Sequence, residues 1–97
     1  MSDTKRPGGP IVHDLKTWPE FFSAIADGSK PFEVRKADRD FVVGDILCLR
    51  EWEPVTKTYS GRAVAMRVTY ILTGGQMGVE TGRVVMGLAN ALAETAP

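Results

Sequence analysis

The spacing of the strand-like segments limits most strongly how this chain can fold. Runs typical of β-strands occupy residues 11–15, 31–36, 46–52, 62–72 and 84–88. The last four follow one another too closely for parallel crossovers, which need about a dozen residues or more. We therefore expect an α+β fold with about five mostly antiparallel strands, in a sheet that curls into a small open barrel and hides its edges.

One helix is predicted near the N-terminus, between the first two strands. Thr17 is a candidate N-cap, with Glu20 three residues later as in a capping box, and Gly28 is a candidate C-terminal cap. The apolar residues at helical spacing between these ends are Trp18, Phe21, Phe22, Ile25 and Ala26. They form one predicted stripe that faces the sheet.

Length and charge restrict the domain organisation and the class of partner. A chain of 97 residues forms one domain, which we place at residues 11–90, between flexible tails at 1–10 and 91–97. Lys plus Arg and Asp plus Glu are both 12. The zero net charge argues against a broad nucleic-acid surface, which is usually basic, but it allows a local basic patch.

Several residue types are too scarce for common kinds of site. Cys48 lies in an apolar run and is predicted to be a small buried side chain. One cysteine and one histidine cannot form a structural zinc site, so we expect no metal and no cofactor. No apolar stretch approaches the roughly 18–20 residues of a membrane span. We therefore expect a cytoplasmic protein without a membrane partner, monomeric by default.

The segment 28–35 carries the strongest candidate for a functional site. Lys30 stands just before the predicted strand 31–36, where Glu33 and Arg35 alternate with Phe32 and Val34. We expect the two apolar side chains to be buried and the two charged ones to project from the opposite face. Such a face can be an ordinary exposed surface with ion pairs, or it can bind an anionic ligand through Lys30 and Arg35.

This segment resembles the ASCH domain, a branch of the PUA-like superfamily. Gly28, Lys30, Glu33 and Arg35 match its G-x-K-x-x-E-x-R signature, and 43–47 (Val-Gly-Asp-Ile-Leu) resembles the step into its next barrel strand. Further similarity to an uncharacterised bacterial and phage subgroup lies at 13–16, 36–41, 59–62 and 68–72. The resemblance extends from about His13 to Leu88, which is most of the chain.

The resemblance implies a PUA-like β-barrel whose helix lies near the signature, with a ligand cleft beside it. The implied ligands are RNA or a modified nucleoside. One ASCH branch is an amidohydrolase that deacetylates N4-acetylcytidine, with a lysine at the position of Lys30 and a threonine three residues later. Glu33 replaces that threonine here, so the resemblance implies binding more than amide hydrolysis.

The candidate ligand-binding residues are charged, aromatic or hydrogen-bonding side chains in and around the signature: Lys30, Glu33, Arg35, Lys36, Arg39, Tyr59 and His13. His13 is either a ligand contact or a hydrogen-bonded structural histidine. Tyr59 and Trp52, with arginines nearby, either stack an unpaired base or pack a loop.

Three functions follow from these observations. The leading expectation is an RNA-binding module for a single strand or one modified nucleotide, with its site at Lys30, Glu33 and Arg35. The second is a nucleoside-modifying amidohydrolase with Lys30 and Glu33 as an acid–base pair. The third is a protein-interaction adaptor, which needs an exposed apolar patch near the glycine-rich residues 73–82.

Overall fold

The structure is a computed structural model that describes residues 8–91. Residues 1–7 and 92–97, which make up most of the two predicted tails, lie outside the described residues. The elements in chain order are β1 (Val12–Thr17), α1 (Pro19–Ala26), β2 (Phe32–Lys36), β3 (Ile46–Glu53), β4 (Thr58–Thr73) and β5 (Arg83–Asn90). No helix among the described residues is long and apolar enough to cross a membrane.

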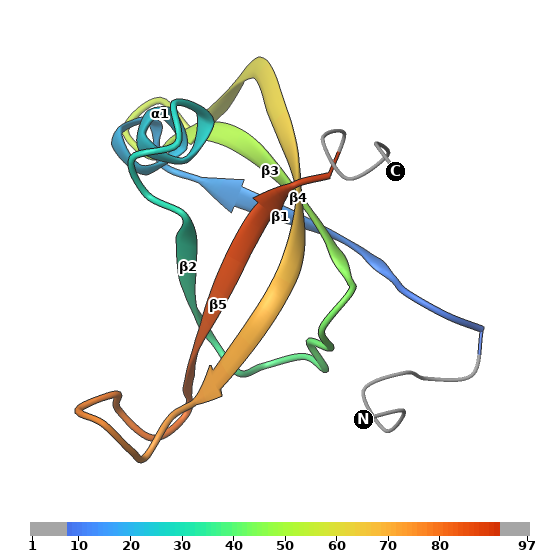
Figure 1. Ribbon diagram of the computed structural model, residues 1–97. Helices are drawn as coiled ribbons and strands as arrows, with labels where there is room; N and C mark the ends of the chain where they lie inside the picture. Colours follow the sequence, from blue (N-terminus) through green and yellow to red (C-terminus); the bar gives the residue numbers. More distant parts are fainter. Residues whose placement is uncertain (1–7, 92–97) are drawn as a thin grey trace.

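The five strands form one strongly curved sheet in the order β1-β3-β4-β5-β2. Only β1 and β3 are parallel, and the other neighbours are antiparallel. The expected set of five mostly antiparallel strands and one helix is therefore confirmed. Figure 1 shows that the sheet curls into a half-barrel, which leaves β1 and β2 as its two edge strands. We call the gap between these two strands the seam.

The core fills the inner face of the half-barrel and is closed at one end by the helix. Its side chains come from every strand except β2, and from α1. The buried apolar residues are Leu15, Phe22, Ile25, Leu47, Leu49, Met66, Val68, Val84, Met86 and Leu88. On β2 the position that faces inward opposite Met86 is Glu33. The core therefore ends in a charged group next to the seam.

The helix differs from its prediction at both its start and its apolar face. Thr17 belongs to β1, and Trp18 is the N-cap residue without a side-chain hydrogen bond, so the predicted capping box is wrong. Phe22 and Ile25 are buried, whereas Trp18 and Phe21 are 52% and 42% exposed. A two-turn helix that packs on one sheet cannot bury all the apolar residues of the predicted stripe.

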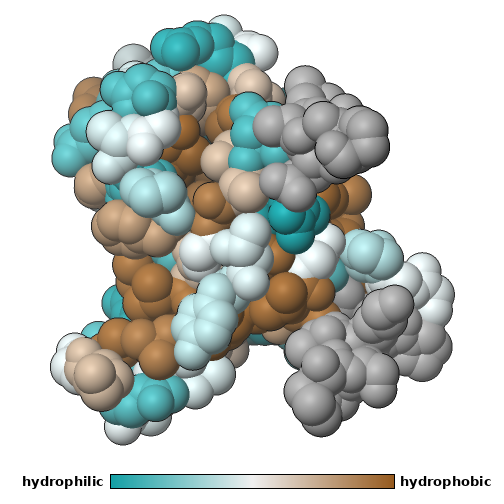
Figure 2. Space-filling view, viewed as in Figure 1, coloured by the Kyte–Doolittle hydropathy of each residue, from teal (hydrophilic) through white to brown (hydrophobic). Residues whose placement is uncertain are grey.

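Two strands also differ from their predictions. β4 begins at Thr58, and residues 54–57 form a tight turn with a 2.7 Å hydrogen bond from the Lys57 N–H to the Glu53 carbonyl. The strand predicted at 62–72 therefore begins four residues earlier than expected. β2 presents Phe32 and Val34 outward, and both are more than 40% exposed. Figure 2 shows apolar side chains gathered over the outer face of β2, β5 and β4.

Candidate functional site

A hollow with a volume of about 600 Å³ lies at the seam. Both edge strands, the start of α1 and the loop after β2 contribute to it. The lining residues are Leu15, Lys16, Thr17, Trp18, Phe21, Lys30, Glu33, Val34, Arg35, Lys36, Asp38, Arg39, Phe41 and Arg83. We call it the seam cavity. Its volume falls within the range of small-molecule sites, roughly 300–1,000 Å³.

A tight turn after α1 places Lys30 at the mouth of the seam cavity. Gly28 has a φ of 88°, which favours glycine, and the Lys30 N–H donates to the Ala24 carbonyl at 3.0 Å. Hydrogen bonding by the Ser29 hydroxyl, and then by its backbone N–H, lowers the pKa of Asp27. This turn fixes the direction in which the chain enters β2.

Glu33 is the central acceptor of the seam cavity, with a side chain that is only 6% exposed. Its Oε1 lies 3.3 Å from Lys30 Nζ, and its Oε2 accepts a 2.5 Å hydrogen bond from Arg35 Nε. The sequence placed these three charges on one face, as found here. It also predicted that Phe32 and Val34 would be buried, and that assignment is wrong, because the inward face of β2 is the charged one.

Arg35 connects the two edge strands across the seam. Its Nη2 donates to the Lys16 carbonyl at 2.6 Å and to Thr17 Oγ1 at 3.2 Å. Both acceptors belong to β1, which does not pair with β2 through backbone hydrogen bonds. Arg35 therefore both lines the cavity and holds its two walls together.

Two aromatic rings form the wall that sequence reasoning missed. Trp18 and Phe21 stack with their ring centroids 6.3 Å apart and an interplanar angle of 23°. The Lys30 ammonium lies 5.3 Å from the centroid of Phe21. The sequence did contain a signal for this wall. The start of the helix has more apolar residues than a short helix can bury, so some of them had to be exposed.

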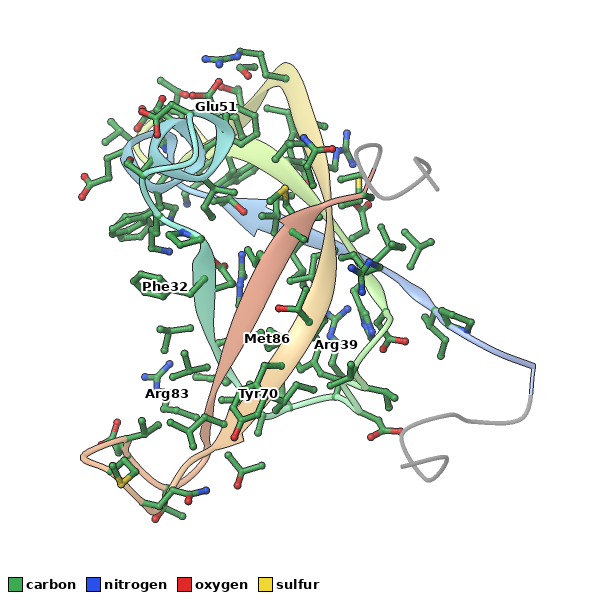
Figure 3. All side chains as sticks on the ribbon, viewed as in Figure 1. Phe32, Arg39, Glu51, Tyr70, Arg83 and Met86 are labelled. Carbon is green, nitrogen blue, oxygen red and sulfur yellow. The ribbon has the colours of Figure 1, made fainter. Side chains whose placement is uncertain are left out.

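Cations dominate the opposite end of the cavity. Lys36 has no ion-pair partner among residues 8–91, whereas Arg39 lies 4.0 Å from Asp38. Arg39 also lies over the Phe41 ring at 6.0 Å. Figure 3 shows Arg83 beside the lower ends of β2 and β5, and Arg39 on the other side of β5 in this view. Positive side chains therefore approach this end from several elements.

The structure places the remaining two candidates elsewhere. His13 is buried, with Nε2 2.7 Å from Asp45 Oδ2 and its ring 4.8 Å from that of Phe41. Tyr59 packs against Trp52 on the outer face of the sheet, with the ring centroids 4.8 Å apart. Neither residue lines the seam cavity. Five of the seven predicted residues thus share one cavity, and His13 and Tyr59 do not.

The arrangement suits an anionic ligand with a flat apolar part. Six cationic side chains and two carboxylates line the cavity, in a chain with zero net charge. Exposed aromatic faces offer stacking, and buried Glu33 offers an acceptor for N–H groups. In the described part of the chain, no cluster of three or more His, Cys, Asp or Glu residues could hold a metal ion.

Comparison with known proteins finds two similarities. The model of a family described as a domain of unknown function (DUF3850) matches residues 12–88. The chain is also 38% identical over 58 residues to an "Uncharacterized 12.9 kDa protein in GpA 3'region" of Escherichia phage P2. That match covers 60% of this chain and 51% of the phage protein, so the chain spans about half the length of this curated relative.

Proposed function

Because this chain belongs to the DUF3850 family, which is described only as a domain of unknown function, we propose a function from the seam cavity itself: the protein binds single-stranded RNA by taking one nucleotide into that cavity. The observation that carries the proposal is the meeting of exposed aromatic rings, a buried carboxylate and several cations in one hollow of about 600 Å³. Each of these groups matches one part of a nucleotide.

The base is assigned to the aromatic wall. Trp18 and Phe21 are roughly half exposed although they are large and apolar. An unpaired base can stack on such rings, and each stacked base contributes about 1–3 kcal/mol. Glu33 lies in the same cavity and can accept a hydrogen bond from a ring or exocyclic N–H of the base.

The phosphate is assigned to the cationic end. Lys36 and Arg39 lie on the loop side of the cavity, away from the helix that supplies the rings. An arginine guanidinium can bind phosphate through two parallel hydrogen bonds, and a lysine acts as a point charge. Glu33 already pairs with Lys30 and Arg35, so those two cations are oriented before a ligand arrives.

We further propose that the half-barrel is a PUA-like barrel of the ASCH type. In support, four residues of the G-x-K-x-x-E-x-R string act together here. Gly28 forms the turn, and Lys30, Glu33 and Arg35 meet in the seam cavity. The concave site supports ligand binding, whereas the exposed apolar side chains on the outer face of β2, such as Phe32 and Val34, are the surface that an adaptor function would use.

The proposal is tested by truncating exposed side chains that line the cavity and do not belong to the core. Trp18→Ala is expected to weaken binding of a single-stranded RNA of about ten nucleotides by roughly five- to hundredfold, through loss of stacking. Lys36→Ala is expected to weaken it several-fold and to reduce its salt dependence. Fluorescence anisotropy measures both affinities, and thermal unfolding checks that the variants remain folded.

The controls are matched in residue type and lie outside the cavity. Tyr70→Ala removes an exposed aromatic ring from β4, and Lys57→Ala removes an exposed cation from the β3–β4 turn. Both should bind RNA like the parent protein. Unchanged affinity in Trp18→Ala and Lys36→Ala, or equal losses in the controls, would refute the assignment of the cavity.

A second candidate function is favoured by the contact between Lys30 and Glu33. A carboxylate and an ammonium 3.3 Å apart in a cavity can serve as base and acid in the hydrolysis of an acylated nucleobase amine. Glu33 would take a proton from the attacking water, and Lys30 would protonate the departing amine. Turnover of acylated cytidines, abolished in Lys30→Ala, is the expected result. Absence of product from a panel of acylated nucleosides would exclude this candidate.

A further inference from the structure

The aromatic pair Trp52 and Tyr59 lies outside the seam cavity and has no part in the function proposed above. The two residues are register partners on β3 and β4, and their rings meet edge to face at 67°. Leu47, Leu49 and Glu51 on β3 are buried, so the alternating position Trp52 faces outward. Glu51, labelled in Figure 3, marks the end of β3 that carries the pair.

Two cations cover these rings from neighbouring strands. Lys16 Nζ lies 4.0 Å from the centroid of Trp52, and the Arg50 guanidinium lies 4.0 Å from that of Tyr59. Lys16 and Arg50 are register partners in the parallel pair β1–β3. The opposing carboxylate is Asp14, whose Oδ2 lies 3.3 Å from Arg50 Nη1 in a solvent-exposed pair. We call Lys16, Arg50, Trp52 and Tyr59 the outer platform.

Lys16 connects the outer platform to the seam cavity. It lines the cavity, and its carbonyl accepts the hydrogen bond from Arg35 that spans the seam. Its ammonium lies over Trp52 on the other side of β1. A ligand that leaves the cavity over the edge strand β1 therefore meets Lys16 first and the two rings next.

We propose that the outer platform is a second RNA subsite, which stacks a base further along the strand whose first nucleotide occupies the seam cavity. This inference rests on the proposed function. Rings combined with cations on a sheet surface bind single strands with little sequence preference, because every base has a π-face and every link carries a phosphate. Lys16 and Arg50 supply the positive charge for the phosphates on either side of the stacked base.

The two tryptophans of the chain report on the two subsites separately. Trp18→Phe keeps a ring in the cavity and leaves Trp52 as the sole tryptophan, whereas Trp52→Phe leaves Trp18. Each variant is titrated with adenosine 5′-monophosphate and with a mixed-sequence RNA of about ten nucleotides, within the roughly 4–16 nucleotides that small barrels cover. The RNA should quench both reporters over the same concentration range, and the mononucleotide should quench Trp18 alone.

The other possible results of these titrations would contradict one or both of the two proposals. Quenching of Trp18 by RNA without any change at Trp52 overturns the second subsite and leaves the cavity function standing. Quenching of Trp52 by RNA without quenching of Trp18 overturns the function proposed for the cavity. If neither reporter responds, both proposals fail.

A substitution provides an independent test of the same inference. Tyr59 is 41% exposed, so Tyr59→Ala should cost little stability. It should weaken binding of the RNA by at least about fivefold, whereas Tyr59→Phe, which keeps the ring, should restore most of the affinity. Tyr70→Ala on the same strand is the matched control. An equal effect of Tyr59→Ala and Tyr70→Ala would show that the platform contributes nothing specific.

Discussion

Asp45 is a fully buried carboxylate that joins two segments of the chain, residues 11–13 and 42–45. It accepts hydrogen bonds from the Ile11 N–H at 3.0 Å and from the Val42 N–H at 3.1 Å. Its Oδ2 also lies 2.7 Å from His13 Nε2. Phe41, which packs on the His13 ring, lines the seam cavity, so this network supports one cavity wall from inside the core.

At the residue scale we predict that Asp45→Asn lowers the free energy of unfolding by about 2–4 kcal/mol. The amide keeps the size of the side chain but cannot accept all three contacts, and a buried polar group without its partners is costly. Denaturant unfolding measures the change. Asp14→Asn is the control, because its ion pair with Arg50 is exposed and should contribute less than about 1 kcal/mol. A similar effect of both substitutions would contradict this role of Asp45.

The sequence predicted individual site residues as far as local spacing allows. An i, i+2 pair in a strand shares a face, so the meeting of Glu33 and Arg35 followed from position alone. The pattern could not tell which face points inward. Apolar residues usually do, but here the inward position lies at the open seam, where a carboxylate with two cationic partners can be accommodated. Two partners of Asp45, Ile11 and His13, lie more than 30 residues away in sequence, and no local rule gives them.

At the element scale, β2 is held differently on its two sides. Five register pairs join it to β5, whereas side-chain hydrogen bonds from Arg35 connect it to β1. The strand therefore depends on one arginine for its position at the seam. Arg35 is therefore the side chain whose loss we expect to affect the contact between the two edge strands most directly.

We predict that Arg35→Ala lowers the free energy of unfolding by about 1–3 kcal/mol, because hydrogen bonds from a charged donor are lost on both sides of the seam. Hydrogen exchange should accelerate in β2 more than in β4, since the loosened edge strand opens locally. Arg62→Ala removes an exposed cation outside the cavity and serves as the comparison. Uniform acceleration in all strands would instead indicate global destabilisation.

Element types were predictable, whereas their ends were not. Hydrophobic spacing, together with residue composition, predicted all five strands and the helix, because period 2 and period 3.6 are distinct signals. Thr17 looked like a helix cap, but its backbone continues the pairing with β3 and its hydroxyl accepts from Arg35. Residues 58–61 lie before the predicted strand 62–72, yet tertiary pairing with β3 extends the strand back to Thr58. In both cases tertiary pairing outweighed local preference.

At the scale of the whole molecule, the charges balance overall but not locally. The net charge is zero, while the seam cavity gathers six cations and two carboxylates. A zero net charge gives little long-range attraction to nucleic acid, so local groups of cations such as this one would have to supply the attraction. The proposed function therefore favours a single strand that can enter the cavity over a duplex, which is usually bound by a broad basic face.

We predict a shallow salt dependence for RNA binding. Three or four phosphate contacts would give a slope of roughly −2 to −3 for log affinity against log salt, at about −0.7 per contact on a single strand. Duplex RNA of the same length should bind more weakly. Titrations at several salt concentrations measure both quantities. A slope steeper than about −6, or tighter binding of the duplex, would point to a wide electrostatic surface in place of the cavity.

The strand order has a consequence for the time course of folding. β3, β4 and β5 are consecutive in the chain and adjacent in the sheet, so this meander closes only short loops and can assemble early. β2 instead pairs with β5, from which it is separated in sequence by β3 and β4, and β1 pairs with β3 at the opposite edge of the sheet. We therefore expect the two walls of the seam cavity to dock last. A ligand bound between β1 and β2 would slow the separation of these two edge strands, which would be the first step of unfolding. Such a ligand would therefore stabilise the folded protein kinetically.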